Sequence, residues 1–82
     1  MSIKSKFSKS KKLRYGLTEV TLKGNKLSVY HGGNMGSTIK HNVNPNLKSL
    51  GLPTIEEMKE KFNVIHEDGS PDYMYVITFK IK

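Results

Sequence analysis

The sequence predicts an α+β domain: a small antiparallel β-sheet of about four to five strands, formed by two hairpins plus a short strand, with one α-helix packed across it. Three observations lead to this fold class: a hairpin pattern over residues 18–31, a capped amphipathic helix after residue 53, and a β-prone run over residues 73–82. The chain has 82 residues, enough for one small domain. We place that domain at residues 15–82, behind a flexible basic arm at residues 1–14.

Residues 18–31 have the pattern of a complete β-hairpin. Gly24 and Asn25 form a two-residue loop, and glycine in the first loop position suits a type II′ turn. Folding about this loop places four aliphatic side chains on one face: Leu22 opposite Leu27, and Val20 opposite Val29. The other face pairs Thr21 with Ser28 and Glu19 with Tyr30. Because a slip of one residue would move every aliphatic side chain to the wrong face, the register is well specified.

The segment between this hairpin and the helix is less regular. Three glycines within residues 32–36 favour a long turn over a phosphate-binding loop, because neither a GxGxxG nor a P-loop pattern is present. Residues 37–43 alternate between apolar and polar side chains and predict a short third strand. A turn at residues 44–46 ends it, and residues 47–52 predict one short helical turn that stops at Gly51.

The predicted helix begins after Thr54 and runs to about Asn63. Thr54 is a suitable N-cap, and Glu57, three residues later, completes the capping-box pattern. Its apolar face consists of Ile55, Met58 and Phe62. We expect this face to pack on the Leu/Val face of the sheet.

The C-terminal part predicts a second hairpin, with a short strand at residues 64–66, a turn at 67–72 and a long strand at 73–82. One face of the long strand carries Tyr73, Tyr75, Ile77, Phe79 and Ile81. Met74 and Val76 lie on the other face, so apolar groups occur on both. This pattern favours an interior strand covered on each side over an exposed patch that binds a partner.

The net charge of +7 is concentrated at the N-terminus. Residues 1–14 contain no acidic residue and carry six cations: Lys4, Lys6, Lys9, Lys11, Lys12 and Arg14. From Tyr15 onward, eight Lys face seven acidic residues. A basic block attached to a nearly neutral domain is typical of an arm that binds a polyanion.

We interpret this arm as a segment that contacts the phosphates of RNA or DNA. Six cations that release counterions would give log K a salt slope of up to roughly −5 on duplex DNA. Five of the six are Lys, which acts as a point charge, so backbone contact is favoured over base reading. Phe7 and Tyr15 add base stacking on single strands. The alternatives are a solubilising tail and, more weakly, binding to a membrane surface.

Three histidines, His31, His41 and His66, are weak candidates for catalysis. Two of them can act as base and acid in RNA cleavage, and three imidazoles can hold zinc. Neither arrangement has a diagnostic spacing here, so the sequence assigns no catalytic residue, no metal and no cofactor. The chain has no Cys, which excludes disulfides, thiolate zinc sites and Cys nucleophiles.

The sequence therefore favours a non-enzymatic, nucleic-acid-associated binding protein. The alternative is a protein-interaction module or inhibitor that docks a strand edge, or the side chains of Tyr73, Met74 and Tyr75, on a host protein or a nucleic-acid-bound complex. A His-dependent ribonuclease is the third hypothesis. No apolar run approaches the ~18 residues of a membrane span, so we expect a cytoplasmic protein without a membrane partner. The Lys-rich, Arg-poor composition makes a phage origin, and hence the host cytoplasm, a further hypothesis.

Overall fold

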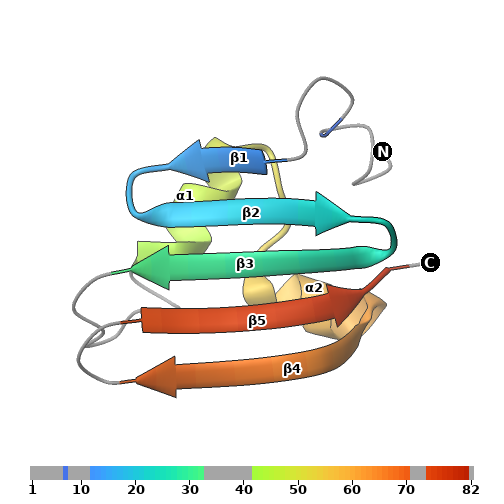
Figure 1. The fold of residues 1–82 in the computed structure, drawn as a ribbon. Helices are drawn as coiled ribbons and strands as arrows, with labels where there is room; N and C mark the ends of the chain where they lie inside the picture. The colour runs from blue at the N-terminus through green and yellow to red at the C-terminus, as the bar shows by residue number, and fades with distance from the viewer. Residues whose placement is uncertain (1–6, 8–11, 33–41, 71–73, 82) are drawn as a thin grey trace.

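The structure, a computed structural model, describes residues 7, 12–32, 42–70 and 74–81. Over these residues the fold is a five-stranded antiparallel sheet in the order β1-β2-β3-β5-β4, with two short helices behind one face (Figure 1). The strands are β1 (Lys12–Tyr15), β2 (Thr18–Lys23), β3 (Lys26–Gly32), β4 (Asn63–Ser70) and β5 (Met74–Lys80). The helices are α1 (Asn44–Ser49) and α2 (Ile55–Lys61). The predicted α+β class is confirmed.

The β2–β3 hairpin forms in the predicted register. Leu22 pairs with Leu27, Val20 with Val29, Thr21 with Ser28, and Glu19 with Tyr30. Gly24 has a φ of 61°, whereas Asn25 has no positive φ, as a type II′ turn requires. The hairpin pattern therefore specified both the turn and the faces.

The first strand begins earlier than the predicted start of the domain at residue 15. Leu13 pairs with Val20 across β1 and β2, so the boundary drawn after Arg14 falls inside a strand. The connecting loop is again glycine followed by one other residue, with a φ of 62° at Gly16. β1 lacks a strong apolar pattern because it is an edge strand whose side chains are mostly exposed. The sequence signal for this loop was a second glycine, Gly16, in the same position relative to a strand as Gly24.

Phe7 also belongs to the folded domain. Its side chain is only 6% exposed and joins the hydrophobic core. The predicted arm therefore supplies one core residue as well as the first three residues of β1. Residues 1–6 and 8–11 lie outside the described residues, and the flexibility predicted for them stays a prediction.

The Asn-Pro-Asn sequence at residues 44–46 begins helix α1, and the turn predicted there is wrong. Pro45 fits the first helical turn, where its missing N–H would have no partner within the helix. Residues 42 and 43 are already helical, whereas residues 37–41 of the predicted third strand lie outside the described residues. Asn44 then joins the two helices: its Oδ1 accepts from the Ile55 N–H at 2.9 Å, and its Nδ2 donates to Glu56 Oε1 at 2.7 Å.

Helix α2 has the predicted capping box. The Thr54 Oγ1 accepts from the Glu57 N–H at 3.2 Å, and Glu57 Oε1 accepts from the Thr54 N–H at 2.8 Å. The backbone hydrogen bond from Thr54 lowers the pKa of Glu57 below its ordinary value. Ile55 and Met58 are buried as expected, but the helix ends before Phe62, which is half-buried and packs edge-to-face on Phe79.

The last two strands form the predicted second hairpin with different bounds. β4 extends to Ser70, so much of the predicted turn at residues 67–72 is strand. A bulge between Val64 and His66 shifts its register. β5 lies between β3 and β4, which confirms an interior strand, but both helices lie on one face only and Val76, on the other face, is half-buried. The helices therefore cover one face of β5, not both faces as predicted.

The hydrophobic core lies between the sheet and the helices. Its fully buried members include Val20, Leu27, Val29, Leu47, Ile55, Met58, Ile77 and Phe79. Alternate side chains of each strand point away from this core, so the sheet has one apolar face and one polar face.

Replacing Phe7 with Ala tests whether the N-terminal segment is part of the fold. We expect the free energy of unfolding to fall by about 3 kcal/mol, because a buried ring leaves a cavity in the core. Tyr15→Ala is the matched control: Tyr15 is 50% exposed, and its loss should cost less than about 1 kcal/mol. Chemical denaturation measures both values. Equal costs for the two variants would contradict the burial of Phe7.

Candidate functional site

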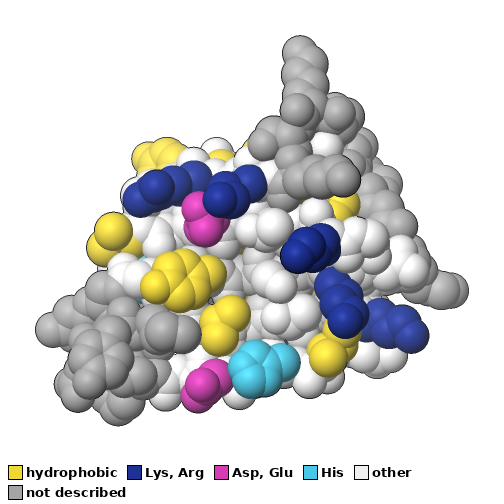
Figure 2. Space-filling view, in the orientation of Figure 1, with side chains coloured by type: hydrophobic (Ala, Val, Ile, Leu, Met, Phe, Trp, Pro, Cys, Tyr) yellow, Lys and Arg dark blue, Asp and Glu magenta, His cyan; other side chains and the backbone are white. Residues whose placement is uncertain are grey.

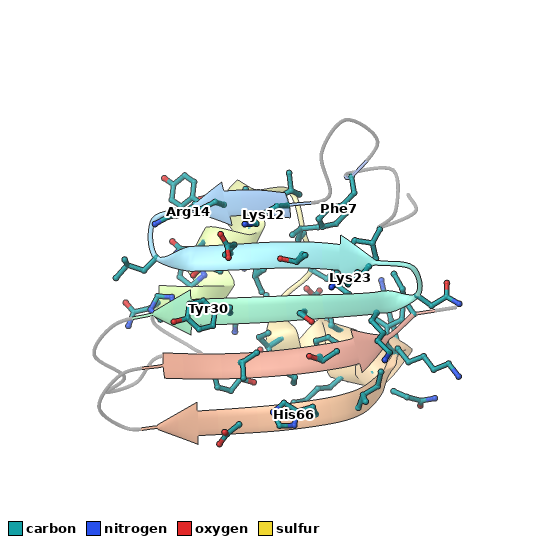
Figure 3. All side chains as sticks on the ribbon, in the orientation of Figure 1. Phe7, Lys12, Arg14, Lys23, Tyr30 and His66 are labelled. Carbon is teal, nitrogen blue, oxygen red and sulfur yellow. The ribbon has the colours of Figure 1, made fainter. Side chains whose placement is uncertain are left out.

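The candidate site is the open face of the sheet, defined as the side chains that point away from α1 and α2. This face is turned toward the viewer in Figures 2 and 3. The strand register arranges its side chains in rows that run across the strands. One row contains Lys12, Thr21, Ser28, Thr78 and His66; the next contains Arg14, Glu19, Tyr30, Val76 and Asp68.

A third row, which we call the lysine row, brings three cations together. Lys23 pairs with Lys26 across β2 and β3, and Lys26 pairs with Lys80 across β3 and β5. Neighbouring strands are about 4.8 Å apart, so like charges in directly opposite positions destabilise the sheet. None of the three forms a salt bridge with another described residue. Among the described residues, the row is therefore an accumulation of positive charge without an ion-pair partner.

Two further cations, on β1, lie near the edge of the open face (Figure 3). Lys12 forms an exposed ion pair with Glu19, with an Nζ to Oε2 distance of 3.6 Å. The Arg14 Nε donates to the Gly16 carbonyl at 3.3 Å. The Lys12 ion pair is solvated and contributes little to stability.

Charge is divided between the two sides of the described part of the fold. The open face carries five cations and two carboxylates, Glu19 and Asp68. The helix side carries three Lys and four Glu: Lys48, Lys59, Lys61, Glu56, Glu57, Glu60 and Glu67. The open face is therefore positive by three charges, and the helix side is negative by one.

The described tyrosines do not share this face. Tyr30 lies on it and is 41% exposed. Tyr15 and Tyr75 belong instead to a row on the helix side, together with His31. Tyr15 is exposed at the edge, and residue 73 lies outside the described residues.

Tyr75 of β5 is buried and belongs to a hydrogen-bond network with β4 and α2. Its hydroxyl donates to Glu67 Oε2 at 2.8 Å, and Lys59 of α2 binds the same oxygen at 3.2 Å. Burial, with the Glu67 contact, raises the pKa of Tyr75 far above its ordinary value. Burial raises the pKa of Glu67, but the Tyr75 and Lys59 contacts outweigh it and lower the pKa overall. Tyr75 is therefore not available to a partner protein. The side chains of Tyr73 and Met74 lie outside the described part of the chain.

His31 is a core residue. The Thr18 hydroxyl accepts from Asn46 Nδ2 at 2.9 Å, which leaves its proton to donate to His31 Nδ1, 2.7 Å away. Burial lowers the pKa of His31 below its ordinary value of 6.5, because the charged ring would lose its hydration. The ring is therefore neutral at neutral pH and links β3 to α1 through Thr18.

His66 does not form a catalytic pair with His31. His66 lies on the open face, opposite Thr78, whereas His31 lies on the helix side. His41 lies outside the described residues. Within the described ranges, no three His, Asp or Glu side chains gather into a possible metal site.

Several binding residues predicted from the sequence lie outside the described residues. Several residues of the open face, in turn, were not predicted to bind a ligand. Residues 4, 6, 9 and 11 lie outside the described part of the chain, and Phe7 is in the core. The lysine row and Tyr30 were not assigned to a site from the sequence. Lys23 and Lys26 are adjacent in the predicted hairpin, but Lys80 joins them only through the pairing of β3 with β5.

Comparison of the chain with protein-family models, curated proteins and solved structures finds no match. In the described part of the chain, neither helix is long and apolar enough to cross a membrane.

The His31 network predicts a pH-dependent stability. Well above pH 6.5 the imidazole is neutral in both the folded and the unfolded chain. Below it, the unfolded chain binds a proton that the folded chain does not, so stability falls until the pH reaches the lowered pKa. The loss is at most about 1.4 kcal/mol per pH unit. Urea denaturation between about pH 7 and 5 should show a steeper loss for the wild type than for His31→Gln. Parallel curves would contradict a depressed pKa.

Proposed function

We propose that the protein binds nucleic acid without catalysing a reaction on it, through contacts between phosphate groups and the cations of the open face. The observation that carries this proposal is the lysine row, in which three cations from three strands lie side by side without a described ion-pair partner. Phosphate oxygens along a strand are the ligand that such an extended row of point charges fits.

The physical basis is the release of counterions from the nucleic acid. Each cation that neutralises a phosphate releases counterions, and this contribution does not depend on base sequence. Seven-eighths of the described cations, all but Arg14, are Lys, which lacks the fork that guanidinium presents to guanine. We therefore propose that the protein contacts the nucleic-acid backbone and has little preference for base sequence.

Lysines of the N-terminal arm can add to the phosphate contacts of the open face. Because β1 begins at Lys12, residues 1–11 join the sheet at the edge strand that carries Lys12 and Arg14. The arm lysines at positions 4, 6, 9 and 11 can add further phosphate contacts. Deleting the arm would also remove Phe7 from the core, so substitutions of its lysines test it more cleanly.

A second candidate function, docking on a partner protein, is supported by the outer strand β4. Val64 and Ile65 are 42% and 48% exposed at its bulge, on a strand that pairs with only one of the described strands. An unpaired strand edge can add a strand from another chain. A complex that survives nuclease and high salt would favour this function over nucleic-acid binding.

A pair of double variants tests the lysine row. Lys23→Gln/Lys26→Gln removes two charges from the open face, and Lys48→Gln/Lys61→Gln removes two from the helix side. We expect the first variant to bind a nucleic-acid probe roughly tenfold or more weakly and to reduce the salt slope of log K by about two. The second should match the wild type in slope. Fluorescence anisotropy over a range of salt concentrations measures both.

Equal losses in the two double variants would mean that total charge, and not the open face, governs binding. Replacing the four arm lysines with Gln, with Phe7 retained, measures the share of the arm separately. A wild-type protein that binds no nucleic acid at low salt would reject the proposed function.

A further inference from the structure

We infer that the ligand of the open face is single-stranded nucleic acid and that Tyr30 is the platform on which one of its bases stacks. This inference rests on the proposed function and names the form of nucleic acid bound. It is carried by the position of the Tyr30 ring, which is a separate observation from the lysine row.

The Tyr30 ring lies along β3, over Gly32. A side-chain carbon placed on Gly32 would lie 3.4 Å from the Tyr30 hydroxyl oxygen, 3.5 Å from its Cε2 and 3.7 Å from its Cζ. Gly32 lies two residues further along the same strand, on the same face, so the ring fills the space that its missing side chain leaves. Figure 3 shows the ring directed along β3 on the open face. One side of the ring is therefore covered by the strand.

The outward side of the ring is accessible. Tyr30 is 41% exposed although it lies on the middle strand of the sheet. Val76 lies opposite it on β5, and Glu19 opposite it on β2, where Lys12 holds the carboxylate. A flat ring backed by glycine and bordered by an aliphatic side chain is a suitable surface for a nucleobase.

The cations lie at distances suited to the backbone of a base stacked there. Lys26 is four residues from Tyr30 on the same strand and faces the same side, about 13 Å away at the rise of a strand. Arg14 and Lys12 lie two strands away across the sheet, on β1. A flexible strand of a few nucleotides can therefore stack one base on Tyr30 and reach both groups of cations with its phosphates.

This arrangement selects an unpaired base. In a duplex the faces of each base are covered by the neighbouring bases, and only the edges are open in the grooves. A ring that lies flat on a sheet offers a face and not a hydrogen-bonding edge, so it can engage only bases whose faces are free. RNA and DNA single strands share this chemistry.

The experiment compares Tyr30→Val and Tyr30→Phe with the wild type on three probes: a short oligothymidylate, an oligouridylate of equal length, and a hairpin duplex with the same number of phosphates. Val is β-branched and suits a strand, and far-ultraviolet circular dichroism verifies the fold. We expect Tyr30→Val to bind the single strands roughly 5- to 150-fold more weakly and to bind the duplex within about twofold of the wild type. Tyr30→Phe should keep the affinity for single strands.

The outcomes separate this inference from the proposed function. Unchanged single-strand affinity in Tyr30→Val, or an equal loss on the single strands and the duplex, overturns the inference, and the lysine-row variants then still test the proposed function. A loss in Tyr30→Phe equal to that in Tyr30→Val also overturns it, because stacking does not need the hydroxyl. A loss on only one of the two single strands supports stacking and identifies the sugar that the face accepts.

Discussion

The sheet of this protein can bury only one of its two faces, and the rest of the structure depends on that constraint. The rows through Val20, Val29 and Ile77 and through Leu27 and Phe79 are apolar on the same side, so both helices must cover that side. The opposite rows are free to carry polar groups. The cations of the open face, the glutamates of the helix side and the exposed Tyr30 ring all follow from this division.

Two asparagines position the short helix α1 against the rest of the fold. Asn44 connects it to the start of α2, and Asn46 connects it to Thr18 and through Thr18 to His31. α1 has six residues and too few internal hydrogen bonds to be stable alone. Its direction is therefore set by side-chain contacts with other elements, and in part by a neutral imidazole.

Features encoded within a few residues were predictable, and features that depend on distant pairing were not. The turn at Gly24 and the capping box at Thr54 are local, so the sequence analysis placed both correctly. Pro45 was ambiguous, since proline suits a turn as well as the first turn of a helix. Leu13 is the only described side chain of β1 that packs against the core, and the lysine row requires a pairing between β3 and β5 that no local pattern reveals. The lysine row was therefore missed, because it forms only when strands distant in the sequence pair with each other.

The place of β5 in the strand order has a consequence for how the chain folds. Residues 26–32 and 74–80 are neighbours in the sheet, although more than forty positions of sequence separate them. Closing so long a loop is slow compared with forming the local hairpin of β2 and β3. While the chain is being synthesised, the hairpin must therefore wait with one edge unpaired, and that edge is a target for association between nascent chains.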